Sequence, residues 1–232
     1  AFADLYRYIS DPDYMNIDYH DLLNESYLSG RAKCIHLNKA QNISHGFPGE
    51  HGDTVYLTTA DEEGMMVSFI QSNYTDFGSG IVIPATGISL QSRGACFSLK
   101  KNHPNQVEGG KKPFHTIIPA FATKKGKPIM SFGVMGGAMQ PQGQAQILVR
   151  MIDYHQNSQA ASDALRWCVL SDMEVAFEKG INKEVIKDLE KRGHKITIRD
   201  SSLFGGAQLI HKIDQGYCGA SDHRKDGQAA GF

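Results

Sequence analysis

The sequence predicts an α+β fold in which β-sheets are covered by helices. Three observations support this prediction: two β-hairpin patterns in the middle of the chain, amphipathic helical segments after them, and short strand-like runs near the end. Sheets and helices each carry an apolar surface that must be buried against another element, so this order favours packed layers. The pattern alone leaves open whether the layers form a four-layer αββα sandwich or another α+β packing.

Both predicted hairpins lie between residues 54 and 135. In the first, Thr54–Ala60 is rich in β-branched and aromatic residues, an acidic turn (DEEG) follows, and Met65–Ser72 returns. In the second, His115–Ala122 and Ile129–Met135 flank a lysine-rich turn that contains Gly126. Each hairpin is expected to contribute two adjacent antiparallel strands.

Three helices are predicted next, from apolar residues spaced three and four apart. They cover Gln144–His155, a stretch from a cap at Asn157 or Ser158 to Cys168, and a stretch from the cap Asn182 to Arg192, ended by Gly193. Short strands are predicted at 195–199, 207–213 and 217–220. Residues 1–53 are predicted to be irregular, with a turn-rich stretch between Asn42 and Asp53.

Composition and charge exclude several classes of function. The formal net charge of -1 over 232 residues gives no reason to expect nucleic acid or an anionic membrane as a partner. No apolar run approaches the roughly 20 residues of a membrane span. The four cysteines form no C-x-x-C pair and the ten histidines show no ligand spacing, so no metal or other cofactor is expected. Isolated thiols favour a reducing, cytoplasmic compartment over a secreted or periplasmic one.

Thr54 is the leading candidate nucleophile because it opens a strand directly after a glycine- and proline-rich stretch. If the bond between Asp53 and Thr54 were cut, Thr54 would carry both a hydroxyl and a free α-amine. An α-amine has a pKa of about 8, so at neutral pH it can act as the general base for its own hydroxyl. The alternative is structural, since threonine is common in strands and Gly-Asp is common in turns.

The segment Gly133–Gly137 (GVMGG) is the second candidate, placed between a predicted strand and a predicted helix. Consecutive glycines let backbone N–H groups face a ligand without obstruction, as an oxyanion hole requires. A plain strand-to-helix turn is the alternative. A phosphate site is less favoured, because neither glycine-rich phosphate motif is present.

Taken in order, these segments resemble the γ-glutamyltransferase family. The motifs are G-D-T-V-Y-L, D-E-E-G, F-G-S-G, a Lys-Pro strand, M-G-G and, near the end, G-A-S-D-H-R. They run through essentially all of residues 54–232, and residues 1–13 resemble the end of the family's large subunit. The resemblance implies the αββα sandwich of N-terminal-nucleophile hydrolases. It also implies two regions: 1–53 as the end of the large subunit plus a linker, and 54–232 as the catalytic small subunit.

The resemblance further implies roles for single residues. Thr54 matches the threonine whose hydroxyl attacks the carbonyl of Asp53, cleaves the precursor, and then attacks a γ-glutamyl carbonyl. Ser72 falls where the family has a threonine that hydrogen-bonds the nucleophile. Gly136 and Gly137 match the oxyanion-hole glycines.

The implied partners are a γ-glutamyl or related amide and the large subunit of the same precursor. Most of that subunit, with an arginine of the donor pocket, is expected before Ala1. A homo-oligomer is compatible with the sequence.

The expected donor pocket departs from the family's pattern at several positions that hold the substrate. His115 and Thr116 replace a Ser-Ser pair for the α-carboxylate, Cys96 replaces an acidic residue for the α-amine with Arg93 nearby, and Tyr74, beside Asn73, replaces an asparagine. A cationic Arg93 would favour an anionic group. Two alternatives therefore stay open: an acylase with a glutaryl, aromatic or other donor, and an inactive, uncleaved homologue.

Overall fold

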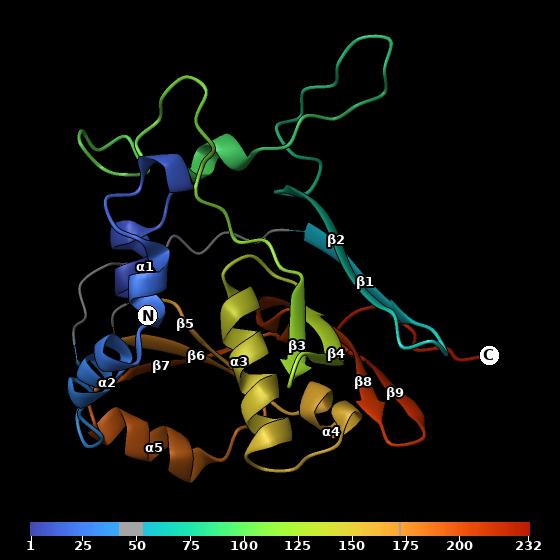
Figure 1. Ribbon diagram of the computed structural model, residues 1–232. Helices are drawn as coiled ribbons and strands as arrows, with labels where there is room; N and C mark the ends of the chain where they lie inside the picture. The colour runs from blue at the N-terminus through green and yellow to red at the C-terminus, as the bar shows by residue number, and fades with distance from the viewer. Residues whose placement is uncertain (42–52, 172) are drawn as a thin grey trace.

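The computed structural model describes residues 1–41, 53–171 and 173–232 (Figure 1), so the turn-rich stretch predicted before Asp53 falls mostly outside the described residues. Its strands form three sheets. The sheets are β1 (Asp53–Ala60) with β2 (Met66–Tyr74); β3 (Ala120–Lys124), β4 (Lys127–Val134), β8 (Ala207–Ile213) and β9 (Gly216–Ser221); and β5 (Trp167–Val169), β6 (Glu174–Glu178) and β7 (Lys195–Arg199). All pairs are antiparallel except β6 with β7. The predicted α+β class is confirmed.

The helices of the described residues are α1 (Phe2–Tyr8), α2 (Glu25–Lys33), α3 (Met139–Ile152), α4 (Ser158–Asp163) and α5 (Lys183–Lys191). Asn157 and Asn182 cap α4 and α5 as predicted, accepting backbone N–H groups at 2.8 and 2.9 Å. Gly193, with φ of 100°, follows the end of α5. None of these helices is long and apolar enough to cross a bilayer.

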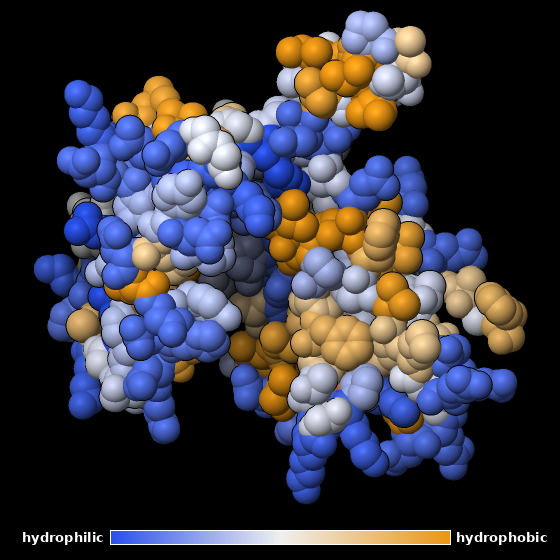
Figure 2. Space-filling view, turned by 45° about the horizontal axis from the view of Figure 1, so that its top comes forward, coloured by the Kyte–Doolittle hydropathy of each residue, from blue (hydrophilic) through white to orange (hydrophobic). Residues whose placement is uncertain are grey.

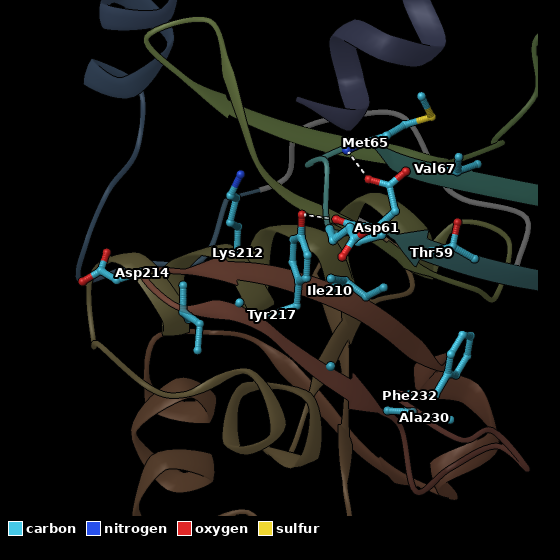
Figure 3. A pocket seen from close by; sticks show the side chains of 17 residues that line it. Thr59, Asp61, Met65, Val67, Ile210, Lys212, Asp214, Tyr217, Ala230 and Phe232 are labelled. Atoms are coloured by element: carbon cyan, nitrogen blue, oxygen red, sulfur yellow. Dashed lines mark hydrogen bonds between the residues drawn. The ribbon is translucent and has the colours of Figure 1, made fainter.

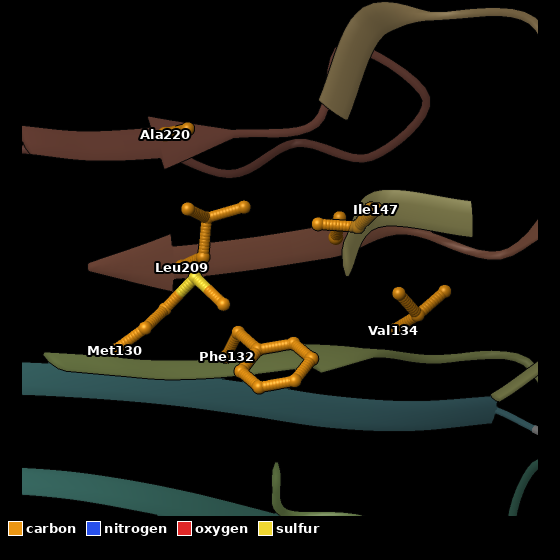
Figure 4. Packing of buried hydrophobic residues seen from close by; sticks show 7 residues of the cluster. Met130, Phe132, Val134, Ile147, Leu209 and Ala220 are labelled. Carbon is orange, nitrogen blue, oxygen red and sulfur yellow. The ribbon is translucent and has the colours of Figure 1, made fainter. Parts of the chain in front are cut away.

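Strand β4 is buried on both faces because its side chains alternate between two neighbours. On one face, Met130, Phe132 and Val134 pack with Leu209 of β8 and Ile147 of α3 (Figure 4). Burying a side chain of this size contributes roughly 1.5–3 kcal/mol. This cluster therefore holds α3 against the four-stranded sheet.

The other face of β4 is covered by β1. The hydroxyls of Thr58 and Ser131 share a hydrogen bond between the two strands. Two residues further along β4, a side chain added to Gly133 would lie 2.9 Å from the ring of Tyr56. The absence of a side chain at Gly133 therefore lets the two sheets approach closely.

The opposite face of the β1–β2 sheet is uncovered within the described residues. Val55, Leu57, Val67 and Phe69 point to that face and are all exposed. Hydrophobic side chains also gather on the segment 75–91, which projects from the rest of the chain in Figure 1 and carries an apolar patch in Figure 2. The described layers are thus helices, the four-stranded sheet and β1–β2.

Several predicted elements are confirmed and others are wrong. The first hairpin and the strands at 195–199 and 207–213 are found where expected. Residues 1–53 are not simply irregular, since α1 and α2 lie there; α2 has no buried face, so periodicity could not reveal it. The strand expected from His115 begins only at Ala120, directly after Pro119, which cannot donate to a sheet.

The predicted boundaries of two helices, α3 and α4, were wrong. Helix α3 starts at Met139, five residues before the predicted Gln144, and ends at Ile152 instead of His155; Pro141 lies in its first turn, where proline is tolerated. Helix α4 ends at Asp163, and Cys168 lies in β5 instead of continuing the helix. Strand β6, which buries Ala176 and Phe177, was not predicted.

The N-terminal segment packs on residues 103–114, at the upper left of Figure 1. The rings of Tyr6 and Phe114 meet edge to face with centroids 6.1 Å apart, and His103 Nε2 lies 3.1 Å from the Tyr6 carbonyl oxygen. Asp11 accepts the backbone N–H of Lys112 at 2.9 Å. These contacts bring Tyr6 to the region that contains the expected donor pocket.

Candidate active site

Thr54 lies at a β-bulge, where the regular pairing of β1 with β2 is interrupted. Asp53 pairs with Tyr74 and Val55 with Gln71, so Thr54 alone faces two residues of β2. A bulge bends its strand and redirects the local side chains, and bulges are frequent beside active sites. The irregularity therefore singles out Thr54 among the threonines of β1.

The hydroxyl of Thr54 donates to Ser72 Oγ at 3.2 Å, and Ser72 Oγ also accepts the backbone N–H of Tyr74 at 2.9 Å. Tyr74 has φ of 79°, a conformation that costs a bulky residue about 1–3 kcal/mol. Asparagine, which the resemblance places here, adopts this conformation more readily. The predicted contact between Thr54 and Ser72 is thus present, held by a strained turn that the sequence did not reveal.

Strands β1 and β4 face each other from two sheets. Thr58 contacts Ser131, and Tyr56, two residues nearer to Thr54, contacts the Gly133 position, two residues nearer to Gly136. Met135 packs in one buried cluster with Tyr56 and Ile118, and Gly136 follows it directly. The start of β1 and the loop after β4 therefore lie at the same edge of the sandwich.

The backbone of Gly136 and Gly137 forms a tight turn into α3. Their φ angles are 112° and 55°, and their carbonyls accept the N–H groups of Met139 and Gln140 at 3.0 and 3.1 Å. Within the described part of the chain, neither glycine N–H donates to a protein group. Both donors are therefore available to a developing oxyanion, at the N-terminal end of a helix whose dipole favours negative charge.

Gly205 supports this turn from the other side. The N–H of Met135 donates to the carbonyl of Gly206 at 2.8 Å. Gly205 has φ of 70°, and a side chain there would lie 2.1 Å from the carbonyl oxygen of Met135. This second glycine pair was not predicted, although two adjacent glycines before a predicted strand are a visible signal.

Gly205→Ala is expected to lower the free energy of unfolding by about 2–3 kcal/mol and to disturb the turn at Gly136. Chemical denaturation of the complete precursor measures the loss. Gly87→Ala is the matched control, because Gly87 also has φ of 70° but no neighbour within 4 Å of an added side chain. It should cost only about 1 kcal/mol; an equal loss in both variants would contradict the support assigned to Gly205.

A buried network of two arginines and two carboxylates holds the Gly205 turn in place. Arg166 donates to the carbonyl of Phe204 at 2.9 Å and to Asp222 at 2.6 Å. Asp222 accepts the N–H of Ala207 at 2.7 Å.

The second arginine of the network, Arg224, donates to Asp222 at 3.1 Å and to both oxygens of Glu178 at 2.6 Å. Asp222 and Arg224 belong to the G-A-S-D-H-R motif, for which no structural role was predicted.

Burial disfavours ionisation of Asp222, but Arg166, the backbone N–H groups of Arg224 and Ala207, and the Arg224 charge together lower the pKa of Asp222 below its ordinary value. The carboxylate therefore stays ionised inside the protein. With two positive and two negative side chains, the network is neutral as a whole.

Two residues of the expected donor pocket, Arg93 and Cys96, lie around Tyr74. The Arg93 guanidinium carbon lies 5.3 Å from the centre of the Tyr74 ring, and Arg93 is 8% exposed. Burial lowers the pKa of Arg93, while the neighbouring Cys96 and Tyr74 raise it. Burial, Tyr74 and Cys96 together raise the pKa of Tyr6, so its phenol remains neutral. Tyr6 was not predicted as part of this pocket.

The remaining predicted residues lie further from these contacts. The carbonyl of Asn73 accepts the N–H of Ser92 at 3.0 Å, which fixes the residue before Arg93. His115 is exposed, with Nδ1 2.9 Å from the carbonyl oxygen of Pro113, and Thr116 is half-buried. Both precede Ile118, which packs on Tyr56, so they lie on the segment that leads to the site.

Other groups offer less suitable chemistry. Burial raises the pKa of the Cys168 thiol to about 11, which keeps it protonated. Among the described residues, no three histidine, cysteine or acidic side chains are grouped as metal ligands would be.

An open groove of about 1070 Å³ lies between the β1–β2 turn and the β8–β9 hairpin (Figure 3). In it, Asp61 accepts the Met65 N–H and the Tyr217 hydroxyl, each at 2.9 Å. Of the β1 residues that line this groove, Thr59 is the nearest to Thr54, and it lies roughly 17 Å away along the strand. The groove is therefore not the site of the nucleophile.

Comparison with known proteins agrees with this geometry. The γ-glutamyltranspeptidase family model matches residues 1–232. The chain is 36% identical to the glutathione hydrolase-like YwrD proenzyme of Bacillus subtilis and 36% identical to the oxamate amidohydrolase proenzyme of Klebsiella pneumoniae. Each match covers the whole chain and 45% of the relative. The crystal structure of cephalosporin acylase from Bacillus halodurans is 44% identical, with a TM-score of 0.92, over the whole chain and 42% of that protein.

The chain thus spans less than half the length of these relatives. Its structural neighbours are γ-glutamyltranspeptidases and acylases, which confirms the predicted N-terminal-nucleophile hydrolase fold. Together with the matched family model and the resemblance found in the motifs, this shows that the chain belongs to the γ-glutamyltranspeptidase family.

Proposed function

We propose that this chain carries the catalytic region of a self-cleaving amide hydrolase or acyltransferase, with Thr54 as its nucleophile. The observation that carries the proposal is the hydrogen bond from the Thr54 hydroxyl to Ser72 at 3.2 Å, at the bulge between β1 and β2. In this proposal residues 1–53 are the end of the large subunit and a linker, and residues 54–232 are the small subunit.

The first reaction is cleavage of the chain itself. The Thr54 hydroxyl attacks the carbonyl carbon of Asp53, its proton passes to the Thr54 nitrogen, and the peptide C–N bond breaks as an ester forms. Water hydrolyses that ester, leaving a carboxylate on Asp53 and a free amine on Thr54. The product contains its own general base, which the precursor lacks.

The second reaction is turnover of an amide donor. The Thr54 amine takes the hydroxyl proton while the oxygen attacks the donor carbonyl, and the N–H groups of Gly136 and Gly137 stabilise the oxyanion. An oxyanion donor of this kind typically contributes about 10²–10³ in rate. The amine leaves with a proton, and water or an acceptor amine releases the acyl group from Thr54.

The donor is proposed to be a γ-glutamyl amide, with a related acyl amide as the second candidate. The second is favoured by the altered pocket, in which Cys96, His115 and Thr116 stand where the family's pattern has an acid and two serines. Among the relatives, one is named for oxamate, an amide that carries a carboxylate, and another for cephalosporin. The proposed protein partner is the large subunit, consistent with relatives named as proenzymes.

Intact-mass measurement of the complete precursor tests the proposal directly. A new chain beginning at Thr54 is expected, followed by turnover of amides in a donor screen that includes γ-glutamyl, glutaryl and oxamate substrates. A complete precursor that stays whole on long incubation, and turns over none of these donors, would favour an inactive homologue.

Ser72→Ala is expected to slow self-cleavage about 10-fold, because the Thr54 hydroxyl loses its oxygen partner. Ser72→Thr should retain most of the rate, since it preserves the hydroxyl that the family's pattern has here. A time course of precursor disappearance measures both variants. Equal rates in the alanine and threonine variants would show that the hydrogen bond has no part in cleavage.

A further inference from the structure

We infer that Arg93 forms a carboxylate-binding site beside the nucleophile, which selects donors whose acyl group carries a free carboxylate. The inference rests on the proposed function, because it names the class of substrate for that same site. It depends on how Arg93 is buried, where it lies and which charges surround it.

Arg93 is buried without complete pairing. Arg93 is 8% exposed, and its Nη1 atom has no hydrogen-bond partner among the described groups. The ion pairs of the described residues include none to Arg93. A buried guanidinium with an unpaired N–H group destabilises the folded protein unless a ligand satisfies it.

The position of Arg93 is linked to Thr54 through a short series of contacts. Thr54 bonds Ser72, whose oxygen accepts the Tyr74 N–H, and the Tyr74 ring lies against the Arg93 guanidinium. Ser92 holds the same turn, since its N–H and hydroxyl both bond the carbonyl of Asn73, at 3.0 and 3.2 Å. Arg93 is therefore fixed by the residues that orient the nucleophile.

The surroundings favour a carboxylate over other ligands. A guanidinium presents N–H groups in a planar fork that matches the two oxygens of a carboxylate. Tyr6 and Tyr74 add aromatic surface, and neutral Tyr6 does not compete for the positive charge. None of the ion pairs of the described residues joins a carboxylate to Arg93, so its positive charge favours an anionic ligand.

A carboxylate from the rest of the precursor is the competing explanation. In that case Arg93 would be a structural ion pair, and its replacement would destabilise the complete protein without altering donor preference. If Arg93 instead binds a donor carboxylate, its replacement should alter donor preference without destabilising the complete protein. The two explanations can therefore be separated.

The test compares the wild type with the variants Arg93→Met and Arg93→Lys, each as the complete, cleaved protein. Each is assayed with two matched anilides: a glutaryl donor and a valeryl donor of the same chain length that lacks the carboxylate. Arg93→Met is expected to lower kcat/KM for the glutaryl donor about 100-fold and for the valeryl donor less than about 3-fold. Arg93→Lys should fall between, because it keeps the charge but loses the fork. Arg199→Met, which removes an exposed arginine of β7, is the matched control.

Thermal melting with free glutarate supplies a readout independent of turnover. Glutarate should raise the melting temperature of the wild type but not of Arg93→Met, whose own melting temperature should equal or exceed that of the wild type. Equal losses for both donors, or a less stable Arg93→Met protein that glutarate affects as it affects the wild type, would overturn the inference. A wild type that cleaves no donor but is stabilised by glutarate through Arg93 would overturn the proposed function and leave the carboxylate site standing.

Discussion

Replacing Thr54 with alanine is expected to abolish both self-cleavage and turnover, with a loss of about 10⁴-fold or more, the scale seen when a catalytic nucleophile is removed. The same oxygen atom is required twice, first against Asp53 and then against the donor. The precursor should therefore remain one chain by intact mass, and release of the amine product should fall to background. No other described hydroxyl shares the bulge position that places Thr54 beside Ser72.

Two variants on the same strand serve as controls for this result. Thr54→Ser keeps the hydroxyl and should retain cleavage, at a reduced rate because its side chain is less restricted. Thr59→Ala removes a threonine that is exposed on β1 and should behave as the wild type. Normal cleavage and turnover in Thr54→Ala would refute the assignment of the nucleophile.

Asp222→Ala is expected to give the largest loss of stability, about 3–5 kcal/mol, because it leaves Arg166 and Arg224 as partly uncompensated buried charges. It also removes the acceptor for the Ala207 N–H, which follows the Gly205 turn. Chemical denaturation of the precursor measures the loss, and the rate of self-cleavage in folded material measures any effect on the turn. Asp163→Ala, which removes a partly exposed carboxylate near the same network, should cost less than about 1 kcal/mol.

The pH dependence of stability gives a second measure of Asp222. Its folded pKa is lowered, so its contribution is complete above the unfolded pKa of about 3.9 and is lost as the pH falls through the lower, folded value. The free energy of unfolding should therefore fall on acidification below about pH 4–5, and Asp222→Asn should show a smaller slope in that range. The same slope in both proteins would show that Asp222 is not strongly coupled to the arginines.

Local patterns predicted the strands better than the helices. The strands at 54–60, 195–199 and 207–213 carry β-branched residues bounded by turns, and that signal is local. Helix α2 has no apolar stripe, so its sequence offers no period to detect. The first turn of α3 contains none of the apolar residues whose spacing predicted this helix, so the pattern placed its start too late.

The candidate site was predicted in part. Thr54 and the glycine pair stand in recognisable local contexts, and the resemblance added Ser72 through its position. The bulge, the left-handed Tyr74 and the support from Gly205 depend on contacts between distant segments, which no local pattern encodes. Arg93 was expected near the donor, but its burial and its unpaired nitrogen became visible only in the folded chain.

The contact between Gly133 and the Tyr56 ring matters for the design of variants that accept other acyl groups. A methyl group on Gly133 would collide with this ring and with the end of the Ile118 side chain, both of which pack on Met135. Any relief of that collision must tilt one layer against the other and so alter the gap in which the acyl carbon has to fit. Bulkier acyl groups could thus be admitted or refused by substitutions at a position that never touches them.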